Sequence, residues 1–135
     1  ESHDKYLCAL TELENVRKRM QRLCNDRVWQ ERKRLLTHIL ELADQLEEAF
    51  EYADADDPVT AGIRMTYQQL QKVLAQEGVQ AVQSVGQVFD PHVHEAVEVT
   101  GSPGERNGVV GEFRKGYVLD GRLLRPARVR VKRID

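Results

Sequence analysis

Hydrophobic residues recur at helical spacing through the first part of the chain. Their steps alternate between three and four residues, which is the a and d rhythm of a coiled coil. This stripe contains Tyr6, Ala9, Leu13, Val16, Met20 and Leu23. No proline or glycine occurs from Asp4 to Ala53, and one continuous helix of that length would extend ~75 Å. A small domain does not need so long a helix for its own core, so the pattern predicts a helix whose stripe is covered by a second chain.

The stripe is interrupted near the middle of this helix and then resumes. Arg27 and Gln30 occupy the next expected apolar positions, and the series restarts one residue later at Val28. The step from Tyr6 to Val28 equals two eleven-residue repeats, which keep a stripe on one side of a nearly straight helix. We expect the segment 27–34 to be the weakest packed part of the pair. The resumed stripe contains Val28, Leu35, Ile39, Leu42, Leu46, Ala49 and Ala53.

A second, shorter helix follows a break in the pattern. Pro58 cannot continue the first helix, and the side chain of Thr60 is suited to cap the next one. Gly78 is well placed just after its end. Its apolar face carries Ile63, Tyr67, Leu70 and Leu74. Two such helical hairpins from two chains would form a four-helix bundle, with residues 35–50 and 63–74 as its core.

Beyond Gly78 the hydrophobic period shortens from that of a helix to that of strands. A short apolar run at 79–82 comes first, and Asp90-Pro91 is the signature of a single helical turn. Residues 94–99 alternate polar and apolar, as in a half-buried strand. The composition of residues 101–108 is that of a loop.

The last part of the chain continues this pattern of short strands. Residues 109–114 are predicted to form a strand, and Asp120-Gly121 is a strong type I′ hairpin signal. Pro126 requires a sheet edge or a bulge, and apolar residues alternate with basic ones at 127–131. We therefore predict an α+β protein. Residues 1–78 would hold the long paired helix and the bundle, and residues 79–135 a small all-β wing, either a sandwich or a partly open barrel.

Composition supports a long exposed helix with a small core elsewhere. The 135 residues are 41% hydrophobic, 31% charged and 6% aromatic. The net charge of −2 argues against bulk attraction to nucleic acid or to an anionic membrane. No apolar run approaches the ~18 residues that span a bilayer. The first residues are charged and no signal-peptide core follows, so we expect a cytoplasmic protein.

The two cysteines, Cys8 and Cys24, would lie ~24 Å apart on one helix and cannot bridge within a chain. A bridge between parallel, in-register helices stays open. Reduced thiols in a cytosolic protein are the interpretation that we prefer.

Candidate chemistry is sparse. The pair of His92 and His94 beside Glu95 has a metal-like spacing, but a structural zinc site needs four ligands and no cysteine is near. A turn followed by a strand explains these residues better. The chain has neither a P-loop nor a nucleophile elbow, and no Gly-rich fingerprint between a strand and a helix, so we expect no enzyme activity and no cofactor.

A basic set near the end of the chain resembles a nucleic-acid patch at first sight. Interleaved aromatic residues for base stacking are lacking, so an acidic protein surface is the preferred partner, and a solvated outer face is the simplest alternative. The set contains Arg122, Arg125, Arg128, Arg130, Lys132 and Arg133.

Four runs of the sequence carry a resemblance to a known family. Two lie in the β part: Gly86-x-x-Phe89-Asp90-Pro91-x-x-His94-Glu95-Ala96-Val97 and Lys115-Gly116-Tyr117-x-Leu119-x-x-Arg122-x-x-Arg125-Pro126-Ala127-x-Val129-x-Val131. Two lie in the helical part: Glu14-Asn15-x-Arg17-Lys18-Arg19 and Leu42-x-Asp44-x-Leu46-Glu47-x-Ala49. Together these runs resemble the motifs of the GrpE family. Gln45 and Glu48 depart from the helical motif, which affects helix details more than function.

The resemblance implies a nucleotide exchange factor of DnaK-type chaperones in the heat-shock protein-folding cycle. Members of the family are homodimers with long paired helices, a short four-helix bundle and one β-wing per chain. One wing binds the DnaK nucleotide-binding domain and holds its cleft open, which releases ADP. The partners implied are a DnaK-type chaperone, a second copy of the chain and, indirectly, chaperone substrates, with no membrane and no nucleic acid.

The resemblance also assigns roles by position. Predicted partner-binding residues are Arg122, Phe113, Val131, Lys115, Arg125 and Arg128. Predicted dimerisation residues are Leu13, Val16, Met20, Leu35, Ile39, Leu42, Leu46, Tyr67, Leu70 and Leu74. Gly116, Tyr117, Phe89 and Pro126 are expected to shape the wing. The alternative function is a dimeric coiled-coil scaffold whose basic β module binds another acidic protein or nucleic acid.

Overall fold

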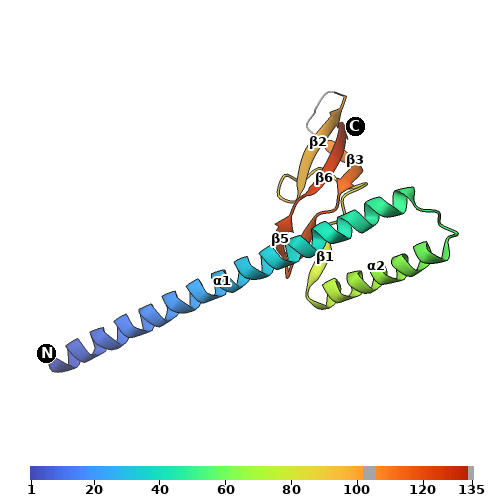
Figure 1. The fold of residues 1–135 in the computed structure, drawn as a ribbon. Coiled ribbons are helices and arrows are strands. Elements are labelled where there is room, and N and C mark those ends of the chain that lie inside the picture. Colours follow the sequence, from blue (N-terminus) through green and yellow to red (C-terminus); the bar gives the residue numbers. More distant parts are fainter. Residues whose placement is uncertain (102–105, 134–135) are drawn as a thin grey trace. The chain divides into compact units, whose positions relative to one another are not determined.

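Two helices precede six strands in the computed structural model, which describes residues 1–101 and 106–133. Contacts divide the chain into two compact units, an N-terminal unit, Glu1–His38, and a C-terminal unit, Ile39–Asp135. Helix α1 (Ser2–Tyr52) has 51 residues, and helix α2 (Pro58–Gln76) has 19. A long helix, a second helix and a C-terminal β region confirm the predicted α+β class (Figure 1).

The start of α2 differs from the prediction. Asp57 is the N-cap, and its carboxylate accepts a hydrogen bond of 2.9 Å from the Val59 N–H. Pro58 is therefore the first helical residue, where a missing N–H costs nothing. The prediction that Thr60 is the cap was wrong, and Thr60 is buried in the first turn. Gly78, at φ 88°, follows the end of α2 as predicted.

The strands form two three-stranded sheets and no closed barrel within the described residues. The first sheet has the antiparallel order β1-β4-β5. In the second sheet β6 lies between β2, to which it is parallel, and β3, to which it is antiparallel. The strand bounds are β1 Val79–Ala81, β2 His94–Thr100, β3 Asn107–Arg114, β4 Tyr117–Leu119, β5 Arg122–Arg125 and β6 Ala127–Arg133.

Most of the predicted turns and strands are present. Asp120 and Gly121 have φ values of 50° and 83° and join β4 to β5, which confirms the hairpin. Asp90 begins the predicted turn, where its carbonyl accepts a 2.8 Å hydrogen bond from the His94 N–H. The predicted loop was too long at its end, because Asn107 already belongs to β3, while 102–105 lie outside the described residues. Pro126 lies between β5 and β6.

The core of the second sheet is built by the alternation seen in the sequence. Val109, Ala127, Val129 and Val131 form a buried cluster, and Phe89 packs against it. The two sheets meet near Gly116, where a Cβ atom would lie 2.4 Å from the backbone nitrogen of Ala127. Only glycine fits this close approach.

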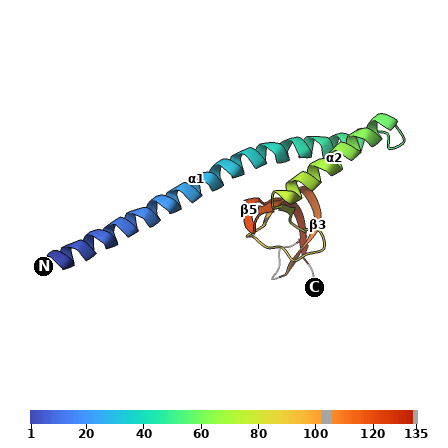
Figure 2. The ribbon, with the colours of Figure 1, turned by 90° about the horizontal axis from the view of Figure 1, so that it is seen from below.

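The part of α1 in the C-terminal unit has two apolar faces. Leu42, a predicted dimerisation residue, is 60% exposed in the single chain, whereas Leu40 and Ala43 are almost fully buried. The sequence predicted one apolar stripe through this segment, with Ile39, Leu42 and Leu46, and the second face was missed. Figures 1 and 2 show this segment and α2 running in opposite directions, and the rings of Phe50 and Tyr67 meet at 5.6 Å. The four-helix bundle needs a second chain and stays a prediction.

Candidate partner-binding site

The hairpin between β4 and β5 presents the first candidate residue. Arg122 begins β5 directly after Gly121 and pairs in register with Leu119, which is fully buried. Side chains alternate between the two faces of a strand, so the buried residues of β4 and β5 fix how the hairpin is oriented in the wing. Arg122 itself is exposed.

Phe113 on β3 is the second exposed candidate. Its side chain is 54% exposed, although it is aromatic. The guanidinium carbon of Arg130 lies 5.2 Å from the ring centroid, within the range of a cation–π contact. Arg130 is itself held by an ion pair of 3.3 Å with Glu98. The structure therefore supports Phe113 from one side while the ring stays accessible.

A groove of about 500 Å³ lies in the C-terminal unit between α1 and the second sheet. Its lining comes from both parts: Asp44, Glu47, Glu48, Glu51, Glu112, Phe113, Arg114 and Arg128. Burial and the neighbouring charges of Arg125 and Arg128 lower the pKa of Arg114. The groove joins Phe113 to a row of carboxylates on the helix.

Two other predicted contact residues lie in different surroundings. Val131 is only 3% exposed and belongs to the core cluster of the second sheet, so its side chain supports the wing from within. Arg128 is about half exposed and lies 3.6 Å from Glu95 on β2. Of these two residues, Arg128 is the one whose side chain a partner could reach.

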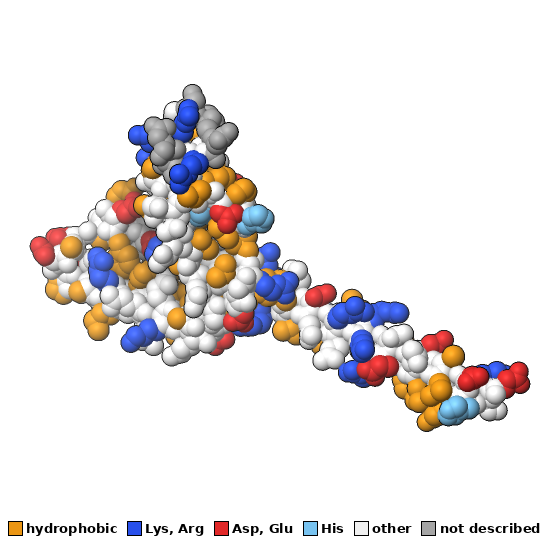
Figure 3. Space-filling view, turned by 180° about the vertical axis from the view of Figure 1, so that it is seen from behind, with side chains coloured by type: hydrophobic (Ala, Val, Ile, Leu, Met, Phe, Trp, Pro, Cys, Tyr) orange, Lys and Arg blue, Asp and Glu red, His pale blue; other side chains and the backbone are white. Residues whose placement is uncertain are grey.

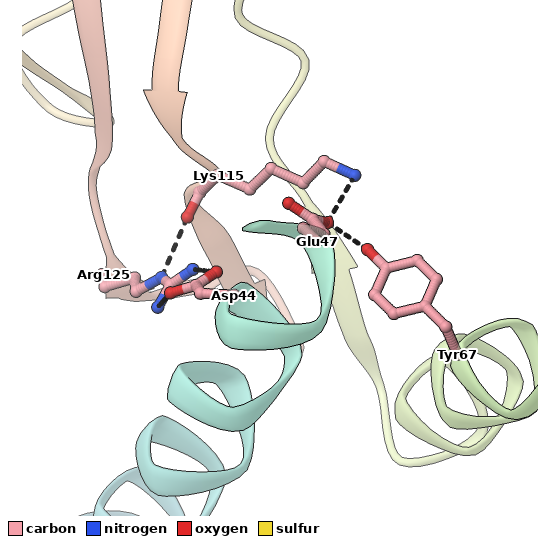
Figure 4. Close-up of polar contacts among 5 residues, drawn as sticks. All are labelled: Asp44, Glu47, Tyr67, Lys115 and Arg125. Atoms are coloured by element: carbon pink, nitrogen blue, oxygen red, sulfur yellow. Dashed lines mark hydrogen bonds and ion pairs between the residues drawn. The ribbon is translucent and has the colours of Figure 1, made fainter. Parts of the chain in front are cut away.

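Arg125 is buried and forms a bidentate ion pair with Asp44 of α1. Its Nη1 and Nη2 atoms each donate a 2.7 Å hydrogen bond to one carboxylate oxygen, and its Nε donates to the Lys115 carbonyl at 2.9 Å (Figure 4). The guanidinium also lies over the Tyr117 ring, 5.3 Å from the centroid. With only 5% of its side chain exposed, Arg125 ties the wing to the helix and offers little surface to a partner.

Glu47 forms the neighbouring connection, one turn further along α1. Its carboxylate accepts hydrogen bonds from the Lys115 ammonium, at 3.0 Å, and from the Tyr67 hydroxyl of α2 (Figure 4). Burial, then the bond to Glu47, raises the pKa of Tyr67 to about 12. Burial lowers the pKa of Lys115, but Glu47 outweighs it and the pKa rises. Glu47 thus links α1, α2 and the wing.

Sequence reasoning missed these ties, because Asp44 and Arg125 are 81 residues apart. One signal was available. Leu40, Ala43, Asp44 and Glu47 share one helix face by their spacing, so two carboxylates continue a buried apolar face. Buried charges are almost always paired, so such a face predicts basic partners in the same fold.

The histidine pair lies where the turn at Asp90 leads into β2, whose first residue is His94. His94 is 5% exposed, its ring stacks near Phe89, and its Nδ1 accepts a 3.0 Å hydrogen bond from the Asp90 N–H. The His92 N–H bonds to the Asp90 carboxylate, and this bond lowers the pKa of Asp90. In the part of the chain that the structure describes, no three His, Cys, Asp or Glu side chains are placed to hold a metal ion.

The predicted dimerisation residues divide by exposure. Leu13, Val16, Met20, Leu35 and Leu42 have between 48% and 67% of their surface exposed in the single chain. Ile39, Leu46, Tyr67 and Leu70 are half-buried, and Leu74 is buried. On α1, hydrophobic side chains reach the surface between charged ones (Figure 3). Neither described helix contains a stretch apolar enough to cross a membrane.

Comparison with known proteins identifies the family. The family model described as GrpE matches residues 1–133. Protein GrpE of Legionella pneumophila (strain Corby) is 37% identical over 132 residues, covering 96% of this chain and 66% of that protein. Protein GrpE of Bacillus cereus (strain AH187) is 37% identical over 138 residues, covering 97% and 70%. The chain thus spans about two thirds of the length of these relatives. On the family match and on this similarity over nearly its whole length, the chain belongs to the GrpE family.

Proposed function

We propose that this chain is a homodimeric co-chaperone that binds the nucleotide-binding domain of a DnaK-type chaperone in the cytoplasm and accelerates ADP release. The observation that carries the proposal is the GrpE family match over residues 1–133. The reaction is a shift of population. A factor that binds the open, low-affinity state of the chaperone better raises its population by the ratio of the two affinities. This requires no nucleophile, metal or cofactor in the chain itself.

Exposure along α1 supports the homodimer. Most of the stability of a helix in a protein comes from packing of its apolar face. The 51-residue helix α1 therefore needs a surface that packs against its apolar stripe. Leu13, Leu35 and Leu42 are each more than half exposed in the single chain. A second copy of the same helix supplies the matching stripe, so we place the dimer contact there.

The wing supports contact with an acidic partner. Arg122 is exposed at the hairpin, and Phe113 presents an aromatic ring with Arg130 behind it. Arginine and aromatic residues are the types that most often dominate the energy of a protein interface. We therefore assign the main contacts to Arg122 and Phe113, and a supporting electrostatic role to Arg128.

Stopped-flow release of a fluorescent ADP analogue from a DnaK-type chaperone tests the proposal. The chain should accelerate release at substoichiometric amounts, and Arg122→Ala should raise the concentration needed by roughly tenfold. Lys132→Ala is the matched control, because Lys132 is also a basic, exposed residue of the wing. If the unmodified chain does not change the rate of ADP release, the proposed function is refuted. Equal effects of the two substitutions would remove Arg122 from the contact.

A further inference from the structure

An exchange factor must distinguish an open cleft from a closed one. A contact whose surroundings are the same in the two states has the same energy in both and cannot distinguish them. Discrimination needs two contacts whose separation is fixed by the factor. If the proposed function holds, on which this inference rests, the stiffness of the connection between the wing and the helices decides how well the open state is preferred.

We propose that five residues form a rigid mount for the wing and thereby produce the preference for the open cleft. The mount consists of Asp44, Glu47, Tyr67, Lys115 and Arg125, drawn in Figure 4. They are positioning residues: they set the orientation of the wing against α1 and α2, while other side chains contact the partner.

The geometry around Arg125 restricts rotation. Two parallel hydrogen bonds of 2.7 Å to Asp44 fix the guanidinium plane relative to α1. A third bond, of 2.9 Å to the Lys115 carbonyl, fixes it to the segment between β3 and β4. The side chain is 5% exposed, so water competes little for these bonds. One buried residue therefore holds the helix and the wing backbone at the same time.

Glu47 supplies a second anchor, three residues along the same helix face. Its bond of 3.0 Å to the Lys115 ammonium connects it to the wing, and its bond to Tyr67 adds α2. A single ion pair would let the wing rotate about that point relative to α1. Two ion pairs at different points along the helix leave only rotation about the line that joins them. The side chains of Leu40 and Ala43, almost fully buried on the same helix face, restrict that rotation as well.

The groove beside the mount has one wall on α1 and the other on the wing. Glu48 and Glu51 line the groove from α1, and Glu112 and Phe113 line it from β3. If a carboxylate of α1 contacts the partner together with Phe113, the separation of these two contacts is set by how the wing is held. A loosened mount would let these two sides of one surface move apart without unfolding either side.

The experiment measures the affinity of the full chain for the chaperone in two states, ADP-bound and nucleotide-free. Asp44→Asn removes the negative charge that faces the buried Arg125, and Glu47→Gln is a milder variant because its partner Lys115 is more exposed than Arg125. Glu41→Gln is the matched control, since Glu41 lies exposed on the same helix. Circular dichroism and the fraction of active dimer confirm that each variant is folded.

The expected result is selective. Asp44→Asn should lower affinity for the nucleotide-free state about tenfold, change affinity for the ADP-bound state little, and lower the maximal rate of ADP release. Glu47→Gln should act in the same direction, and Glu41→Gln should leave both affinities unchanged. A merely structural role would lower both affinities together through a smaller active fraction. Equal losses in both states, or no loss for either variant, would overturn the inference while wild-type acceleration kept the proposed function intact.

Discussion

The two apolar faces of α1 lead to opposite predictions for Leu40 and Leu42. Leu40 is 0% exposed and lies on the face that carries the ties to the wing, whereas Leu42 is 60% exposed on the other face. Truncation of a fully buried leucine to alanine costs about 2–5 kcal/mol, because the lost transfer free energy and the cavity add. For a domain of ~100 residues each kcal/mol lowers the melting temperature by about 4–8 °C. Leu40→Ala should therefore lower the melting temperature of the C-terminal unit by at least ~8 °C.

Leu42→Ala should act on a different quantity. Its side chain loses less than ~1 kcal/mol of contact within the single chain, because most of it is exposed. If a second copy covers it, the loss appears in the dimer dissociation constant, at roughly tenfold for each 1.4 kcal/mol. Sedimentation equilibrium measures that constant, and hydrogen exchange of the β4 and β5 amides measures whether the wing stays docked.

The contrast between the two variants is what tests the reasoning. Leu40→Ala should raise exchange in β4 and β5 and leave the dissociation constant within about threefold. Leu42→Ala should weaken the dimer and leave the wing amides protected. If Leu40→Ala weakened the dimer as much as Leu42→Ala, or left the wing amides unchanged, the assignment of the two faces would be wrong.

Three further predictions concern single groups. Gly116→Ala should destabilise the wing by about 1–3 kcal/mol in urea unfolding, since its Cβ would lie 2.4 Å from the Ala127 nitrogen, whereas Gly62→Ala, with open space around it, should not destabilise. Asp57→Ala should cost about 0.5–2 kcal/mol by removing the cap of α2, and Asp57→Asn should retain most of the stability. The folded pKa of Tyr67, about 12, lies above its ordinary 10.0 because of burial and the bond to Glu47, so its contribution to stability is complete below pH 10 and is lost as pH rises toward 12. Tyr67→Phe should flatten that part of the pH–stability curve, and an unchanged curve would contradict the raised pKa.

The sequence predicted those elements that local chemistry determines. The proline-free, glycine-free run gave α1, Asp120-Gly121 gave the hairpin, and the alternation at Ala127, Val129 and Val131 gave the buried side of β6. The cap of α2 was misassigned because both Thr60 and Asp57 are residue types that cap helices. Proline is favoured at the first helical position, so Pro58 places the cap at Asp57.

The site was predicted less completely than the fold. Arg122 and Phe113 are exposed on the wing, in keeping with a surface role. Arg125 and Lys115 were both predicted to bind the partner, yet they point back to Asp44 and Glu47. Nothing local separates an arginine that faces a partner from one that is buried against its own helix, because that difference depends on a contact between residues far apart in the chain.

The position of β6 has a consequence for the order of folding. This strand follows all the others in the sequence, yet it is the central strand of its sheet and pairs with both β2 and β3. On a ribosome, β2 and β3 emerge with no partner between them and must wait for β6. The backbone hydrogen bonds within a helix join residues close in the sequence, so the helices can form earlier. Synthesis from the N-terminus therefore favours formation of α1, with its apolar stripe, and of α2 before the second sheet of the wing is complete.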